Sequence, residues 1–299
     1  MIRALAANRT FHFFIMFLAM MVWGVSWPIG KIAAEHASPD VAAFWRYTVS
    51  LVSFIPVMLL MKPSYRAETA GVVITVIAGA LTGAFNWLFF AGLSHGLAGY
   101  GGTIVTTMAP VLTFVLSVLV FRTKVRRMQL LGILTGLAGG AVLLKLPQDA
   151  ENLMSVGVLY FVIAALVWSL VTLATQRAVK KIDVMVFTLI VFAMTALINL
   201  FVALPYHPFD VGAYGPAFWE SILFVGLAGG TFSTTVYFLS SGKLGAAVTA
   251  IYLFLVPVGD IVSSYFIFGE VPAVPTVIGC ILAFAAVLIF NVTGNEAAA

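Results

Sequence analysis

Apolar residues dominate ten stretches of the chain, and each stretch is bounded by prolines, glycines or charged residues. An α-helix rises about 1.5 Å per residue, so about 20 apolar residues in a row can cross the hydrocarbon core of a bilayer. The connections are mostly short, so successive helices should be close neighbours. The pattern predicts ten transmembrane helices near residues 13–34, 41–61, 70–92, 98–120, 128–144, 156–176, 184–204, 217–239, 245–267 and 273–292.

Composition excludes a water-soluble domain. Of the 299 residues, 62% are hydrophobic and only 9% are charged, and the mean hydropathy is +1.11. A soluble domain carries roughly 25% charged residues, because water must wet its surface. Lipid is therefore expected to surround most of the chain, which predicts an all-α membrane protein.

Basic residues are concentrated on one set of connections. The amino-terminal tail and every second loop hold 12 lysines and arginines, whereas the opposite loops hold only Lys145. The 12 are Arg3, Arg9, Lys62, Arg66, Arg122, Lys124, Arg126, Arg127, Arg177, Lys180, Lys181 and Lys243. The positive-inside rule then predicts a multi-pass protein of the cell inner membrane with both termini in the cytoplasm. The same distribution accounts for the net charge of +4 without a nucleic-acid partner.

The two halves of the chain repeat each other. At an offset of 147 residues, glycines and prolines coincide: Gly79 with Gly226, Gly83 with Gly230 and Pro110 with Pro257. Trp23 and Trp168 coincide at an offset of 145. The repeat predicts two five-helix units, residues 1–146 and 153–299. Because five is odd, the second unit should enter the membrane from the opposite side.

Inverted repeats of this kind suit alternating access, in which a solute site between the halves opens to either side of the membrane. The repeat therefore favours a transporter. Two alternatives come from other functional classes. One is a membrane scaffold in which the duplication serves stability alone, and the other is a channel without a carrier cycle.

Several short motifs carry a family resemblance: Trp23-Gly24, Pro39, Phe44-Trp45-Arg46, Pro110, Pro257 and Phe268-Gly269-Glu270. The chain resembles the drug/metabolite transporter superfamily, in particular its EamA-type ten-helix branch, over essentially its full length. Among the branches it is most similar to amino-acid exporters, including exporters of aromatic amino acids. The resemblance implies an inner-membrane transporter without a prosthetic group. The chain departs from the pattern where the first half has Arg122-Thr123 and where Arg46 has an apolar counterpart near Leu189.

The predicted solute pocket combines aromatic side chains with small polar groups, which suit reversible binding of a small amphipathic solute. For any one of these residues, packing between helices is the alternative role. The candidates are Trp23, Ser26, Trp27, Asn86, Trp87, Thr103, Thr106, Thr107, Trp168, Thr172, Ser233, Thr234, Tyr237, Thr249 and Tyr252.

Four charged residues lie within predicted helices, where a charge at the bilayer centre costs about 2.5–3.5 kcal/mol. Glu220 lies near the outer end of its helix, where its side chain is expected to extend toward the headgroups. Lys31 lies near a helix end and is expected to extend toward the headgroups. Arg46 lies deeper and needs a protein partner or a solute contact. Asp260 is either a proton-coupling carboxylate or a structural link to a neighbouring helix.

No motif for catalysis, metal binding or nucleotide binding occurs in the sequence. A single cysteine, Cys280, excludes an internal disulfide and a multi-cysteine metal site. The chain is therefore not expected to be an enzyme or to hold a metal or a cofactor, and its expected partners are a small-molecule solute and membrane lipid. The sequence predicts export of amino acids or similar small amphipathic metabolites, with export of lipophilic drugs or cations as the alternative.

Overall fold

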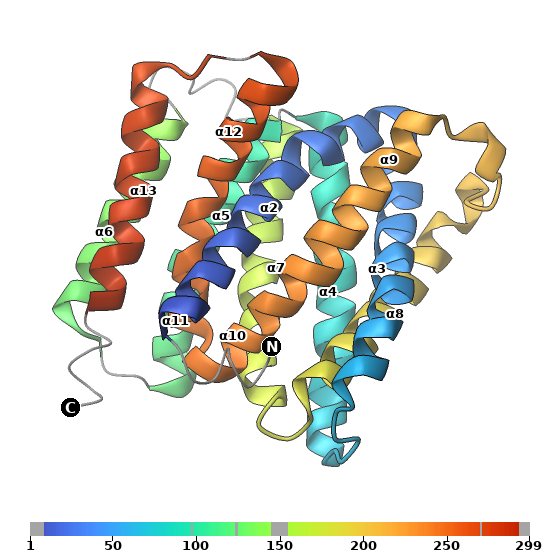
Figure 1. Cartoon of the computed structure of the whole chain (residues 1–299), viewed down its shortest axis with the longest axis horizontal. Coiled ribbons are helices and arrows are strands. Elements are labelled where there is room, and N and C mark those ends of the chain that lie inside the picture. The colour runs from blue at the N-terminus through green and yellow to red at the C-terminus, as the bar shows by residue number, and fades with distance from the viewer. Residues whose placement is uncertain (1–8, 97, 123–124, 145–154, 270, 293–299) are drawn as a thin grey trace.

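The computed structural model describes residues 9–96, 98–122, 125–144, 155–269 and 271–292 (Figure 1). These residues form helices joined by connections, and the one β-type contact among them is an isolated antiparallel bridge between Ala67 and Ile182. The prediction of an all-α protein is confirmed. Glu270, Lys145 and the predicted unit boundaries at 146 and 153 lie outside the described residues.

The helical segments coincide with the predicted stretches to within five residues. Eight are single α-helices: α2 (Arg9–His36), α3 (Pro39–Met61), α4 (Thr69–His95), α5 (Ala98–Phe121), α6 (Arg127–Leu143), α7 (Val156–Ala178), α8 (Val184–Ala203) and α13 (Val274–Val292). Two are composite: α9 (Pro216–Phe224) with η4 (Val225–Thr234) and α10 (Thr235–Leu244), and α11 (Ala246–Ala250) with η5 (Ile251–Leu255) and α12 (Val256–Phe268). The short helices η2 (Leu204–Tyr206) and η3 (Val211–Ala213) lie between α8 and α9.

Nine helical spans within the described residues are long and apolar enough to cross a membrane. The remaining segment, α6, has 17 residues and a length of about 26 Å, slightly less than a typical hydrocarbon core. The count of ten spans therefore stays a prediction.

Both composite segments depart from α-helical geometry. The segment η4 is a ten-residue π-helix. Its hydroxyl side chains follow the wider turn, because Ser233 Oγ donates to the Ala228 carbonyl at 3.0 Å, five residues earlier. In α11 to α12, the 3₁₀ segment η5 comes directly before Pro257, which lacks the N–H that a regular helix would use. Such irregular turns inside long helices frequently mark functional sites.

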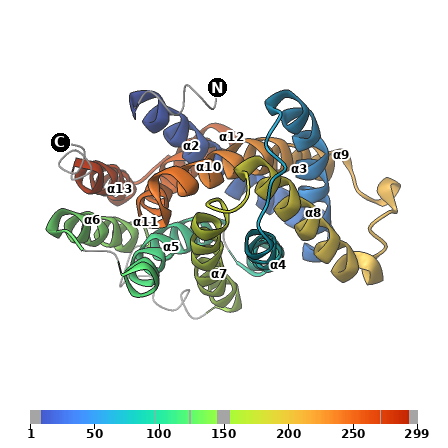
Figure 2. The same cartoon turned by 90° about the horizontal axis from the view of Figure 1, so that it is seen from below.

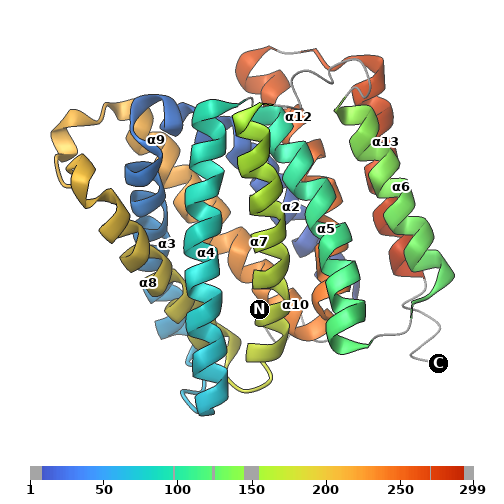
Figure 3. The ribbon, with the colours of Figure 1, turned by 180° about the vertical axis from the view of Figure 1, so that it is seen from behind.

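The helices pack in a bundle with two distinct edges. The helix α6 packs against α13 at one edge and α3 packs against α8 at the other. Between the edges, Figure 2 shows α5, α7 and α4 along one side of the bundle and α12, α2 and α10 along the opposite side. Figure 3 shows α4, α7 and α5 next to one another, in agreement with the contacts that α7 makes on both flanks.

The basic connections share one end of the bundle. In Figure 1 the start of α2, the α3–α4 and α7–α8 connections and the end of α13 all lie at the lower end. Two of these connections bind each other: Glu68 and Lys181 form an ion pair, and the Glu68 N–H donates to the Lys181 carbonyl at 3.0 Å. The cytoplasmic location of this end stays a prediction.

Glycines allow the closest helix contacts. A methyl group added at Gly24 in α2 would lie 2.4 Å from the Val256 carbonyl oxygen in α12. One added at Gly259 in α12 would lie 2.4 Å from the carbonyl oxygen of Met21. In α6, a methyl group at Gly136 would lie 2.3 Å from the Phe254 ring. Only a residue without a Cβ allows helices to approach this closely.

Candidate functional site

A cavity lies in the middle of the bundle and is lined by residues of α2, α3, α4, α5, α7, η4, η5 and α12. Its volume is about 40 Å³, which is room for about three water molecules. The described residues that line it are Trp23, Ser26, Trp27, Arg46, Tyr47, Phe85, Phe89, Val105, Thr106, Trp168, Thr234, Leu253 and Val256. Both halves of the chain contribute to this lining.

Aromatic rings form most of the cavity wall. Trp23 and Trp168 meet edge to face with ring centroids 5.3 Å apart. Phe85 packs against Trp168 at 4.6 Å, and Trp27 packs against Phe89 at 4.7 Å. These tilted contacts hold the rings in fixed orientations. The wall is therefore largely apolar, and it suits the apolar part of a small solute.

Arg46 is the charged residue of the described lining. It is 4% exposed, and its guanidinium carbon lies 4.7 Å from the centre of the Phe89 ring, within the range of a cation–π contact. Its Nη1 donates to Asn86 Oδ1 over a long distance of 3.5 Å, and its Nε has no hydrogen-bond partner. Within the described parts of the chain, no acidic side chain lies within 4.0 Å of it.

Asn86 lies outside the cavity lining and contacts the guanidinium of Arg46. It is fully buried, and its Nδ2 donates to the Ala43 carbonyl at 2.8 Å. A longer contact of 3.4 Å joins it to Asn199 in α8. These bonds fix the amide so that its oxygen faces the guanidinium.

The serine and threonine hydroxyls of the lining already donate their protons within the protein. Ser26, Thr106 and Thr234 each donate to a backbone carbonyl four or five residues earlier on the same helix. A hydroxyl that donates its proton in this way keeps acceptor lone pairs. Towards the cavity these groups therefore act as hydrogen-bond acceptors.

The π-helical segment η4 is bound to the two helices beside it. Trp23 Nε1 in α2 donates to the Gly229 carbonyl at 2.9 Å. On the other side, Ser50 Oγ in α3 donates to the Gly226 carbonyl at 2.9 Å. The irregular backbone of η4 is thus held by α2 and α3 where it reaches the cavity.

The predicted site residues divide into two groups. Those that line the cavity are Trp23, Ser26, Trp27, Thr106, Trp168, Thr234 and Arg46. Those that lie outside the lining are Asn86, Trp87, Thr103, Thr107, Thr172, Ser233, Tyr237, Thr249, Tyr252 and Asp260. A solute contact by any of them stays a prediction.

Several residues outside the lining have structural partners. The Tyr237 hydroxyl lies 3.0 Å from Thr172 Oγ1, and the Tyr237 ring lies 5.2 Å from that of Trp23. Trp87 Nε1 donates to Asp40 Oδ1 at 2.8 Å, near the start of α3. Tyr237 therefore supports the aromatic wall, and Trp87 links α4 to α3.

Asp260 is 5% exposed. A methyl group at Gly102 in α5 would lie 3.1 Å from Asp260 Oδ2 and 3.3 Å from the Trp27 ring. The carboxylate therefore lies close to the α5 backbone and beside Trp27, without reaching the cavity lining.

Sequence reasoning missed six lining residues: Tyr47, Phe85, Phe89, Val105, Leu253 and Val256. Two of them had a usable signal, because Phe85 and Phe89 are four residues apart and so share one face of a helix. Tyr47 had only its position next to Arg46 in the sequence as a signal. The aliphatic residues carried no signal, because they resemble the lipid-facing residues of the same helices.

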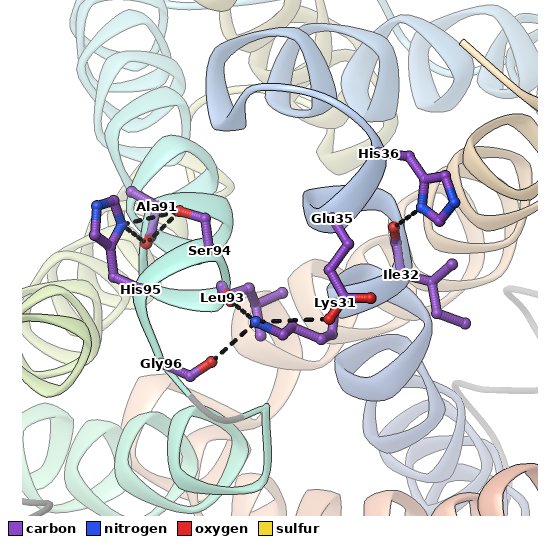
Figure 4. A network of polar contacts seen from close by, with 9 residues as sticks. All are labelled: Lys31, Ile32, Glu35, His36, Ala91, Leu93, Ser94, His95 and Gly96. Carbon is purple, nitrogen blue, oxygen red and sulfur yellow. Dashed lines mark hydrogen bonds and ion pairs between the residues drawn. The ribbon is translucent and has the colours of Figure 1, made fainter.

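Lys31 differs from its expected role, as Figure 4 shows. Its Nζ donates to the Leu93 carbonyl at 2.6 Å and to the Gly96 carbonyl at 3.3 Å. Glu35 lies 3.9 Å away as an exposed ion-pair partner. The ammonium group thus caps the carboxyl end of α4, where free carbonyls and the helix dipole favour a cation. It joins α2 to α4 instead of extending to the headgroups.

The architecture and the central cavity define a polytopic helical membrane protein with a cavity lined by both of its halves. The sequence pattern of the EamA-like transporter family matches residues 10–145 and again residues 155–292. The chain belongs to this transporter family.

Two relatives match most of the chain. The uncharacterized transporter YvbV of Bacillus subtilis (strain 168) is 25% identical over 93% of this chain and 90% of its own length. An S-adenosylmethionine uptake transporter of Rickettsia prowazekii is 24% identical over 82% of this chain and 80% of its own.

A third relative and a solved structure complete the comparison. A probable amino-acid metabolite efflux pump of Salmonella typhimurium is 28% identical over 52% of this chain and 50% of its own length. A crystal structure of 18% identity covers 98% of this chain and 100% of its own with a TM-score of 0.75, which supports the fold alone.

Proposed function

We propose that this protein is a secondary transporter that exports amino acids or similar small amphipathic metabolites across the inner membrane by alternating access. The central cavity carries the proposal. It is lined by both halves of the chain, with aromatic walls and one buried cation. Such a site suits a solute with one apolar and one polar part.

Helix packing supports the proposed inverted repeat of residues 1–146 and 153–299. In the first half α4 packs against α7 and α8, and in the second half the matching segment α9–η4–α10 packs against α2 and α3. Likewise α5 packs against α7, while α12 packs against α2. A two-fold axis that exchanges the halves produces these pairs, with the α6–α13 and α3–α8 contacts lying on it.

The size of the cavity favours a carrier over an open channel. At about 40 Å³, the cavity admits about three water molecules, which is less room than a large amino acid needs. The helices or lining side chains must therefore move before a solute can enter. Alternating access provides such a movement, because the two halves rock about the solute site.

The choice of solute rests on the lining and on the relatives. One relative bears the name of an amino-acid metabolite efflux pump, and another that of an S-adenosylmethionine uptake transporter. Export of lipophilic cations or drugs is the second candidate, and the buried cation Arg46 in the lining disfavours it.

Counterflow in proteoliposomes tests the proposal. Vesicles that contain the purified protein and an excess of one unlabelled L-amino acid are placed in the same labelled amino acid, and all twenty are compared. We expect saturable accumulation of a subset, absent from protein-free vesicles. Uptake of none, or uptake that rises linearly without saturation, contradicts a carrier of amino acids.

Two tryptophan variants test whether this cavity is the solute site. Trp168→Ala removes part of the lining, and we expect at least a tenfold loss of apparent affinity. Trp219→Ala is the control, because Trp219 in α9 lies outside the lining and its indole bonds a loop carbonyl, that of Val211. Equal effects of the two substitutions are evidence against this cavity as the solute site.

A further inference from the structure

We propose that the guanidinium of Arg46 binds a carboxylate group of the transported solute. The inference rests on the transport function proposed above and names the chemical group that the cavity recognises. Three features of the structure support it: the orientation of the guanidinium, the absence of an internal counter-ion in the described residues, and the hydrogen-bonding capacity of the rest of the lining.

The Arg46 guanidinium has aromatic neighbours, but its hydrogen-bond donors are mostly unused. Its carbon lies 4.7 Å from the centre of the Phe89 ring, with Tyr47 at 5.8 Å as a second aromatic neighbour. The contact from Nη1 to Asn86 is long, at 3.5 Å, and Nε is buried without a partner. A guanidinium has five N–H donors arranged to bind a carboxylate with two parallel hydrogen bonds. Most of these donors are available here.

No acidic residue neutralises Arg46 in the described part of the chain. The ion pairs found there are Lys31 with Glu35 and Lys181 with Glu68. Asp40 accepts the indole N–H of Trp87. A buried cation needs a partner, and an anionic group that enters the cavity supplies one.

The remaining polar groups complement the rest of an α-amino acid. The hydroxyls of Ser26, Thr106 and Thr234 have donated their protons to their own helices. Their oxygens can accept from an ammonium group, which carries only donors. The aromatic wall contacts the apolar part. We therefore infer a solute that bears a carboxylate and an apolar body, and the site disfavours a cation that lacks a carboxylate.

The unmodified protein provides the first test. For the amino acid with the largest counterflow, competition by unlabelled acid is compared with that by its C-terminal amide and its decarboxylated amine. We expect both analogues to compete at least about tenfold more weakly, which is the typical effect of losing a charged hydrogen-bond partner. Equal competition by the amide or the amine overturns the role of Arg46 while leaving the transport function intact. Absence of counterflow with every amino acid contradicts the transport function itself.

Variants at position 46 provide the second test. Arg46→Gln should weaken the acid at least tenfold and leave the amide nearly unchanged, so that discrimination between acid and amide disappears. Arg46→Lys keeps the charge but not the planar fork, and it should restore part of that discrimination. Arg66→Gln is the matched control, because Arg66 is an exposed arginine in the α3–α4 connection. Unchanged discrimination in folded Arg46→Gln protein contradicts the proposal, and a similar loss for acid and amide assigns Arg46 a structural role only.

Discussion

Trp23 and Trp168 occupy matching positions in α2 and α7, and both line the cavity, yet their indole N–H groups differ. Trp23 Nε1 donates to the Gly229 carbonyl at 2.9 Å. Trp168 Nε1 is buried beside the Tyr237 hydroxyl, but the two groups do not meet with full hydrogen-bond geometry. The two halves therefore present similar aromatic rings to the cavity, but the hydrogen bonding of the two indole N–H groups differs.

The backbone also differs at the positions that match in the two halves. Gly229 belongs to the π-helical segment η4, whereas the residue 147 positions earlier, Thr82, belongs to the regular helix α4. There the Thr82 hydroxyl donates to the Ala78 carbonyl at 2.7 Å, as in an ordinary helix. The two halves have matching residues at equivalent positions, but their helices differ in geometry there. The two sides of the cavity are therefore not equivalent.

A second matched contact shows the same asymmetry. At the position after each tryptophan, Gly24 lies against the Val256 carbonyl of α12. The Ser169 hydroxyl instead shares its one proton between the Ala109 carbonyl of α5 at 3.1 Å and the Ala165 carbonyl of its own helix at 2.8 Å. Close backbone approach stabilises the first contact, whereas a side-chain hydrogen bond stabilises the second.

The largest effect is expected at Gly24. In Gly24→Ala the new methyl group would lie 2.4–2.6 Å from backbone atoms of α12, and a backbone cannot rotate aside as a side chain can. We expect destabilisation of about 1–3 kcal/mol or more and at least a tenfold loss of counterflow. Ser169→Ala is the matched change in the other half, and loss of one hydrogen bond should cost about 1 kcal/mol.

Thermal unfolding in detergent measures the stability of Gly24→Ala and of Ser169→Ala. If Gly24→Ala unfolds at the temperature of the unmodified protein, the α2–α12 contact is not as close as described, and the asymmetry between the halves at this position is lost.

A smaller effect is expected from the tryptophans. Trp23→Phe removes the hydrogen bond to Gly229, whereas Trp168→Phe removes only a poorly aligned contact with the Tyr237 hydroxyl. Both changes remove a similar volume, so their difference isolates the hydrogen bond. We expect Trp23→Phe to be less stable than Trp168→Phe by about 0.5–1.5 kcal/mol, measured by detergent unfolding. Equal stabilities show that η4 does not depend on this bond.

The helix positions could be predicted because lipid imposes a simple rule. Every backbone polar group in the membrane must be paired internally, so long apolar stretches become helices whatever surrounds them. The π-turn of η4 could not be predicted in this way. It depends on acceptors and donors from α2 and α3, such as Trp23 and Ser50, which are distant in sequence.

The site was only partly predictable for a related reason. Tryptophans and hydroxyl residues stand out in an apolar helix, and Trp23, Trp27 and Thr106 do line the cavity. Tyr252 and Thr249 have the same chemistry but lie outside the lining. Because these helices are apolar on all faces, periodicity does not separate the side that faces the cavity from the side that faces lipid or another helix.

The smallest effect on stability, and the sharpest on mechanism, is expected at the ends of α2 and α7. Lys31 in α2 donates to the Leu93 carbonyl at the end of α4. The matching residue of α7, 145 positions later, is Gln176, whose Oε1 accepts from the Ala246 N–H at the start of α11 at 2.8 Å. In Figure 1 the carboxyl ends of α2 and α7 lie at opposite ends of the bundle. Each bond therefore joins helices at a different end of the proposed transport path.

We expect Lys31→Met and Gln176→Leu each to change stability by only about 0.3–1 kcal/mol, because one polar contact near a helix end is lost. Their effects on access should be opposite, since each variant loosens a different end. The single cysteine of the chain allows a clean measurement: Cys280→Ser is combined with Thr106→Cys in the lining, and the rate of alkylation by a membrane-impermeant reagent is followed from each side. Lys31→Met should raise the rate severalfold from one side and Gln176→Leu from the other. If both variants raise the rate from the same side, the two bonds are not paired closures of an alternating-access cycle.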